Sequence, residues 1–134
     1  MIDAQLPLQA AVVSVLKGDA AVAAIIAGRV YDRAPHEPGS SYITLGASQS
    51  VDDSDPCHSL VTCYLDIDCW SEAVGFPEVK RLGAAAAKAL DADLVVEGFR
   101  IVMRRVERVI YQREADGLTS RAIIRLRYDL QATA

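Results

Sequence analysis

The feature that most constrains the fold of this chain is an alternating segment near its middle. Between Leu60 and Trp70, apolar side chains occupy every second position and mostly polar ones lie between them. The apolar set is Val61, Cys63, Leu65, Ile67 and Cys69. A period of two with one apolar face is typical of an antiparallel strand that is buried on one side only. The chain is therefore expected to form a sheet that is covered on one face.

The last third predicts two further long strands, at about 99–111 and 119–131. In the second strand, apolar residues from Ala122 to Leu130 alternate with Arg121, Arg125, Arg127 and Asp129. Asp116-Gly117 between the strands is a strong hairpin turn signal. The apolar positions of the first strand change parity at Arg104-Arg105, which predicts a β-bulge there.

The remaining elements complete an α+β pattern. Helical spacing predicts helices at 5–17, 20–27 and 77–90, and a short strand is expected at 42–46. Residues 30–41 read as a loop, and the polar stretch 48–58 as a mobile loop or a projecting hairpin. The order α-α-β-β-α-β-β predicts one domain over 1–134, an antiparallel sheet of about four main strands with helices packed on one face.

Composition narrows the partners and the compartment. The 134 residues are 51% hydrophobic, enough for one core, and the net charge of −4 does not favour duplex binding. Met1–Gln5 shows no signal-peptide pattern. Cys57, Cys63 and Cys69 form no C-x-x-C pair, so reduced, buried thiols and an intracellular assembly compartment are expected.

Asp66 and Asp68 form a D-x-D pair on the polar face of the central strand. We expect cross-strand pairing with arginines such as Arg125 or Arg127; a subunit interface and a metal site are the alternatives. Trp70, at the end of that strand, is expected to anchor packing or an interface.

The polar stretch before that strand holds Asp52, Asp53 and Asp55 but lacks the spacing of a calcium loop. A solvated tip or a contact surface for a partner is expected. His36 and His58 are expected in solvated loops. Asp55, Cys57 and Ser59 flank His58, but neighbours on an extended segment point in opposite directions and cannot form a catalytic relay.

Arginines concentrate in the last third of the chain. They are Arg100, Arg104, Arg105, Arg108, Arg113, Arg121, Arg125 and Arg127. Interleaved acids and the lack of an aromatic platform favour a salt-bridged face or a subunit interface over DNA contact. No Walker loop, Rossmann glycine pattern or zinc spacing occurs, so we expect no enzyme activity, catalytic residue, cofactor or metal. The predicted interface residues are Asp52, Asp53, Asp55, Asp66, Asp68, Trp70, Arg104, Arg105, Arg125 and Arg127.

Several segments, taken in order, resemble the tail terminator or tail-completion family of long-tailed bacteriophages, prophages and gene transfer agents. The alanine-rich 19–27 leads into Gly28-Arg29-Val30-Tyr31-Asp32, similar to the family's G-R-V-Y-D. Tyr42-Ile43-Thr44-Leu45-Gly46 resembles its P-Y-V-T-L-G, with Ser41 in place of proline. Cys69-Trp70-Ser71 resembles a strand ending in W-S.

This resemblance implies a structural virion protein, a homohexameric ring on the head-proximal end of the tail tube. The ring would meet the tail tube protein and a head-completion or adaptor protein, with DNA passing through its hole without sequence-specific binding. It implies no membrane partner. The alternatives are a head-completion or adaptor protein of the neck and a small cytosolic ligand-binding or enzymatic domain.

Overall fold

The computed structural model describes residues 1–133. Its elements are α1 (Gln5–Gly18), α2 (Ala20–Ile26), β1 (Val30–Tyr31), β2 (Ser41–Asp52), β3 (Leu60–Ser71), α3 (Pro77–Leu90), β4 (Phe99–Arg113) and β5 (Ser120–Ala132). The predicted α+β fold is confirmed, with five strands instead of about four.

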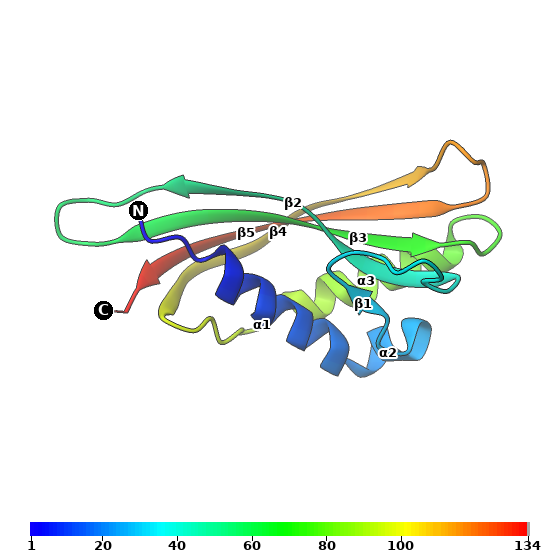
Figure 1. Ribbon diagram of the computed structural model, residues 1–134, viewed down its shortest axis with the longest axis horizontal. Helices are drawn as coiled ribbons and strands as arrows, with labels where there is room; N and C mark the ends of the chain where they lie inside the picture. Colours follow the sequence, from blue (N-terminus) through cyan, green and yellow to red (C-terminus); the bar gives the residue numbers. More distant parts are fainter. Residues whose placement is uncertain (134) are drawn as a thin grey trace.

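The strands lie in the order β1-β2-β3-β5-β4 (Figure 1). Only the β1–β2 pair is parallel; the other neighbours are antiparallel. All three helices lie on one side of this sheet (Figure 1). Among residues 1–133 no helix lies on the other side, so the polar faces of β3 and β5 are left open on a broad surface.

β1 corrects the prediction of a loop over 30–41. Val30 and Tyr31 pair with Ile43 and Thr44, and the Arg29 carbonyl accepts a hydrogen bond from the Ile43 N–H at 2.9 Å. The Arg29 side chain also donates to the Ser41 carbonyl at 2.8 Å, which closes the intervening loop. Two paired residues are too few to show a period in the sequence.

β2 extends beyond the predicted short strand to Asp52, so the projecting hairpin is confirmed rather than the mobile loop. Its register shifts between Leu45 and Ser48. A Cβ at Gly46 would lie 2.9 Å from the Asp68 carboxylate, so glycine is needed where the strand crosses β3. The shift interrupts the alternation of side chains, so the sequence pattern does not predict the second half of the strand.

β4 has two bulges, and the prediction of one at Arg104-Arg105 is wrong. The register shifts between Ile101 and Met103 and again between Val106 and Arg108. Arg104 itself is paired with Tyr128, whose side chain is buried. The two shifts therefore turn Arg104 toward the helices and leave Arg105 on the open face.

The core lies between the helices and the inward faces of β3 and β5. Its largest members include Leu8 and Leu16 of α1, Leu82 of α3, Ile67 of β3 and Leu126 of β5, each at most 1% exposed. Each such side chain stabilises the fold by roughly 1.5–3 kcal/mol through burial. This layer fixes the sheet as a rigid platform for its open face.

The three cysteines do not share one environment. Cys63 and Cys69 are buried in β3, as predicted, but Cys57 is exposed, and the prediction of a buried thiol there is wrong. Cys57 lies in the β2–β3 loop, before the strand begins at Leu60. Burial raises the pKa of the Cys69 thiol to about 12.

Within residues 1–133, no single helix is long and apolar enough to cross a membrane. α1 and α2 together have the length and apolar composition of a span, but the pair is bent by 77°.

Candidate interaction surface

The open face of the sheet is built from the polar positions of β3 and β5. Because β3 and β5 pair without a register shift, Asp66 lies opposite Arg125 and Tyr64 lies opposite Arg127. Trp70 lies opposite Arg121 in the same ladder. The face is thus a set of cross-strand pairs of acids, aromatics and arginines.

Asp68 is the most enclosed acid on this face, with 5% of its surface exposed. Arg121 binds its Oδ1 from Nη2 at 3.1 Å and from Nε at 3.3 Å. The Arg121 guanidinium also lies 4.7 Å from the Trp70 ring centroid, and the Trp70 indole donates to Thr44 Oγ1 at 2.9 Å. Burial raises the pKa of Asp68, against the opposing effect of Arg121.

The part of the face around Arg125 has longer contact distances than the part around Arg121. Arg125 Nη1 lies 3.9 Å from Asp66 Oδ1, and its guanidinium lies 4.8 Å from the Tyr64 ring centroid. Arg127 pairs with its neighbour Asp129 at 3.1 Å. The predicted pairing of Asp66 with Arg125 is present, whereas the partner of Asp68 is Arg121.

Aromatic rings accompany the arginines after all. Trp70 and Tyr64 carry Arg121 and Arg125 over their rings, and Tyr42 stacks on Trp70 with centroids 6.1 Å apart. The prediction that no aromatic platform lies beside the arginines is therefore wrong. The rings are covered by the chain's own guanidinium groups, which removes the bare stacking surface that single-stranded nucleic acid needs.

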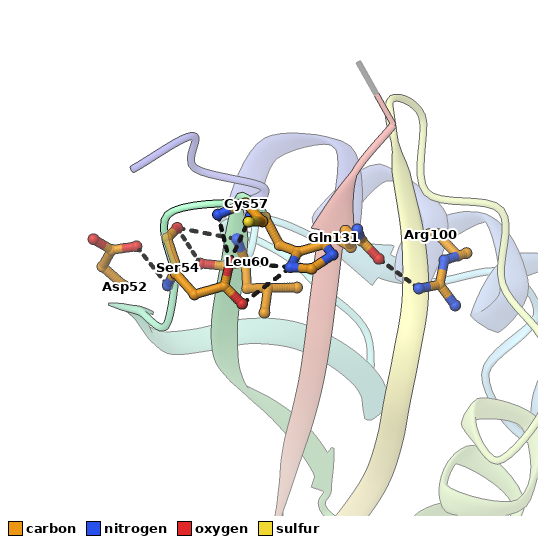
Figure 2. Close-up of polar contacts among 8 residues, drawn as sticks. Asp52, Ser54, Cys57, Leu60, Arg100 and Gln131 are labelled. Carbon is orange, nitrogen blue, oxygen red and sulfur yellow. Dashed lines mark hydrogen bonds and ion pairs between the residues drawn. The ribbon is translucent and has the colours of Figure 1, made fainter.

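The tip of the β2–β3 hairpin carries the three predicted loop acids, Asp52, Asp53 and Asp55, of which Figure 2 labels Asp52. Asp52 accepts from the Ser54 N–H at 3.2 Å, and Asp55 accepts from the N–H groups of Cys57 and His58 at 2.7 Å each. Hydrogen bonds from the Ser54 side chain and then from its N–H lower the pKa of Asp52, and the hydrogen bond from the His58 ring is the main cause of the lowered pKa of Asp55. Asp52 and Asp55 thus shape an exposed turn.

The His58 imidazole pairs with Asp55. Its Nδ1 lies 3.0 Å from Asp55, and no hydrogen bond among residues 1–133 joins the imidazole to Cys57 or Ser59. The described part of the chain also contains no group of three His, Cys, Asp or Glu side chains that could hold a metal ion.

The β4 arginines do not form one set. Arg104 reaches under the sheet to the end of α3, where Nη1 lies 3.3 Å from Asp93 and Nη2 lies 3.5 Å from the Asp91 carbonyl. Arg105 and Arg108 instead lie exposed on the open side, without an ion pair in the described chain. Arg100 donates to the Gln131 side chain (Figure 2).

Arg100 and Arg108 were missing from the predicted interface residues. Both lie on the edge strand and are exposed, but the two bulges of β4 disrupt the alternation that would have placed them on one face with Arg105. Their presence in an arginine-rich strand was visible in the sequence; their orientation was not.

Comparison with known proteins gives two findings. The family model of the tail completion protein gp17 matches residues 10–128. A chain in the solved structure of the virion of a native gene transfer agent particle is similar over 98% of this chain and 100% of its own length, with a TM-score of 0.90 and 30% identity. No curated protein matches the sequence.

The family model covers most of the chain, and the structural similarity extends from end to end with sequence identity in support. The chain therefore belongs to the tail completion protein gp17 family, whose members are structural proteins of the tail or neck of phage and phage-like virions.

Proposed function

We propose that the chain forms a ring, most simply a hexamer, that caps the head-proximal end of a phage or gene transfer agent tail tube. There it joins the tube to the head-completion complex, acting as a structural part without catalysis. The observation that carries this proposal is the end-to-end similarity to a chain of an assembled virion, at a TM-score of 0.90 and 30% identity.

The surface supports a role in assembly. Its arginines lie against acids or aromatic rings over much of the open sheet face, including Arg121 with Asp68 and Arg125 with Asp66. A face of this kind presents directional charge pairs that suit specific contacts between proteins. The candidate contact residues Trp70, Asp66 and Arg127 all lie on it.

The charge distribution also suits passage of DNA. The net charge is −4, and Arg121 and Arg127 are engaged by Asp68 and Asp129, so β5 offers little free positive charge to grip phosphates. DNA would move through the hole of the ring without sequence-specific contacts.

Negative-stain imaging of the purified chain, alone and mixed with purified tail tubes, tests this proposal. We expect rings with a central hole, and tubes with one capped end that faces the head in intact particles. Capping of the opposite end, or binding only to isolated heads, would instead place the chain among the head-completion or adaptor proteins of the neck. A chain that stays monomeric and binds neither structure would contradict the proposal.

A further inference from the structure

Both lateral edges of the sheet are free over the same half of the molecule. β1 covers β2 only at Ile43 and Thr44, so within residues 1–133 no strand lies beside β2 from Leu45 to Asp52. At the other edge, β4 has a neighbour on one side only. Free strand edges are templates for pairing with another chain.

The free stretches lie level with each other across the sheet. Gln49 pairs with Tyr64, Tyr64 with Arg127, and Arg127 with Arg105. The regular segments Ser48–Asp52 of β2 and Met103–Val106 of β4 therefore lie at the same height on opposite edges, although β4 is the longer strand.

The backbone groups on these edges point outward at matching positions. The hydrogen bonds from the Asp53 N–H to the Leu60 carbonyl (3.1 Å) and from the Thr133 N–H to the Gly98 carbonyl (3.0 Å) fix the alternation in each ladder. From that alternation, the residues with outward N–H and C=O groups are Ser48, Ser50 and Asp52 on β2 and Ile101, Arg104 and Val106 on β4. Across the register, Ser50 lies level with Arg104 and Ser48 with Val106.

The strand directions also match. β2, β3, β5 and β4 alternate in direction, so β2 and β4 run in opposite senses. When a second copy is placed edge to edge with the same side of its sheet upward, its β2 is antiparallel to β4 of the first copy. Such a contact joins the β4 edge of one copy to the β2 edge of the next copy. Repetition of the contact closes into a ring when the rotation between neighbouring copies is a whole fraction of a full turn.

The charge on β4 also favours pairing with the β2 edge of a second copy. Arg105 lies directly opposite Arg127 and Arg108 opposite Arg125, which places like charges side by side in the β4–β5 ladder. Arg127 and Arg125 are offset by Asp129 and Asp66, whereas Arg105 and Arg108 have no ion pair among residues 1–133. The edge strand thus carries an excess of positive charge that acids from outside the chain would stabilise.

The opposite edge supplies such acids. Asp52, Asp53 and Asp55 project at the end of the β2 edge, and Asp52 lies level with Ile101 of β4, next to Arg100. Figure 2 shows Asp52 and Arg100 at the same end of the sheet, on either side of β3 and β5. In a neighbouring copy, the acidic tip would therefore approach the basic start of β4.

We infer that the ring is held together by a continuous sheet, in which the β2 segment Ser48–Asp52 of one copy pairs antiparallel with the β4 segment Ile101–Val106 of the next. The acidic hairpin tip lies against Arg100 of that neighbour. This inference rests on the proposed ring, and it adds which surfaces of the chain form the contact.

Disulfide trapping tests the pairing. In a Cys57→Ser background, which removes the exposed native thiol, Gln49→Cys is combined with Arg105→Cys or with Met103→Cys. All three positions lie on the open face of the sheet. Oxidation with copper phenanthroline, alone and on tail tubes, should give a ladder of covalent oligomers up to the closed ring on non-reducing gels. Each single variant should give monomers.

A matched control places the second cysteine at the other end of β4. Gln112 lies level with Tyr42, where β1 covers the edge of β2, so Gln49→Cys with Gln112→Cys should not cross-link. Visible rings without a ladder from either test pair would overturn the inference and leave the proposed ring intact. Absence of rings from the wild-type chain on and off the tubes would contradict the proposed function itself.

Charge exchange gives an independent test. Arg100→Glu with Arg105→Glu makes both edges acidic, and Asp52→Lys with Asp53→Lys makes both basic. Each variant alone should lose the ring by light scattering, whereas an equimolar mixture should recover it, because acidic and basic chains can alternate. Arg81→Glu with Lys17→Glu, at exposed positions of α3 and α1, is the control for charge change and should keep the ring. Failure of the mixture, with all variants folded by circular dichroism, would count against the inference.

Discussion

At the scale of single residues, Asp68 shows how the open face holds a charge that is shielded from water. Burial raises its pKa above the ordinary 3.8 in spite of the ion pair with Arg121. The folded state thus binds the proton more tightly than the unfolded state does. The resulting stabilisation is present below the ordinary pKa and is lost as pH rises through the raised value.

Asp68→Asn removes this titration while preserving the shape of the side chain. The free energy of unfolding of the variant, minus that of the wild type, should therefore increase as pH rises from about 3.5 to about 6.5. Urea denaturation at several pH values measures it. Glu97→Gln, which removes an exposed carboxylate, is the control for loss of one negative charge. A difference that is constant or falls over this range would show that burial does not dominate at Asp68.

At the scale of elements, the contact between α3 and β4 depends on a missing side chain. A Cβ at Gly83 would lie 2.8 Å from the Tyr111 hydroxyl and 3.0 Å from its ring. Gly83→Ala should gain about 1 kcal/mol of helix propensity but lose roughly 1–3 kcal/mol through overpacking, for a net destabilisation. In a Tyr111→Ala background the same change should become stabilising. Urea midpoints of the wild type, the two single variants and the double variant measure the coupling between Gly83 and Tyr111.

Gly18→Ala is the matched control, since a Cβ there meets nothing within 4 Å. It should be neutral or stabilising by about 0.5 kcal/mol in both backgrounds. If Gly83→Ala destabilised the chain equally with and without the Tyr111 ring, the contact would not be the cause.

How far the sequence predicts these elements depends on the regularity of each strand. β3 and β5 pair without a shift, so their alternation predicted their extent and inward faces, and also the pairing of Asp66 with Arg125. β2 and β4 contain bulges, which reverse the side-chain parity within the strand. The bulge positions follow from packing against neighbouring strands, and the period of the sequence does not encode them. The period of the sequence therefore did not show that the Arg104 side chain contacts the end of α3.

At the scale of the whole molecule, the chain separates its two charge excesses along opposite edges of one sheet. The β2–β3 hairpin projects beyond the helices at one end of the sheet, and the β4–β5 turn projects at the other (Figure 1). The acidic tip and the basic start of β4 share the first of these ends, as the register shows. A ring joined at these edges would place all its acidic tips at the same end.

Such a ring should be sensitive to salt, because its contacts unite exposed charges. Exposed ion pairs contribute about 0.2–1 kcal/mol each, and added salt screens them as the Debye length falls from about 10 Å at 0.1 M to about 3 Å at 1 M. With two or three such pairs in each interface, the association constant should fall roughly tenfold over that range. Analytical ultracentrifugation at stepped ionic strength measures it. The chain with both edges exchanged, Arg100→Glu and Arg105→Glu together with Asp52→Lys and Asp53→Lys, should form rings with the same salt dependence. Assembly that strengthened with salt would instead indicate an apolar contact and would exclude the charged edges as its basis.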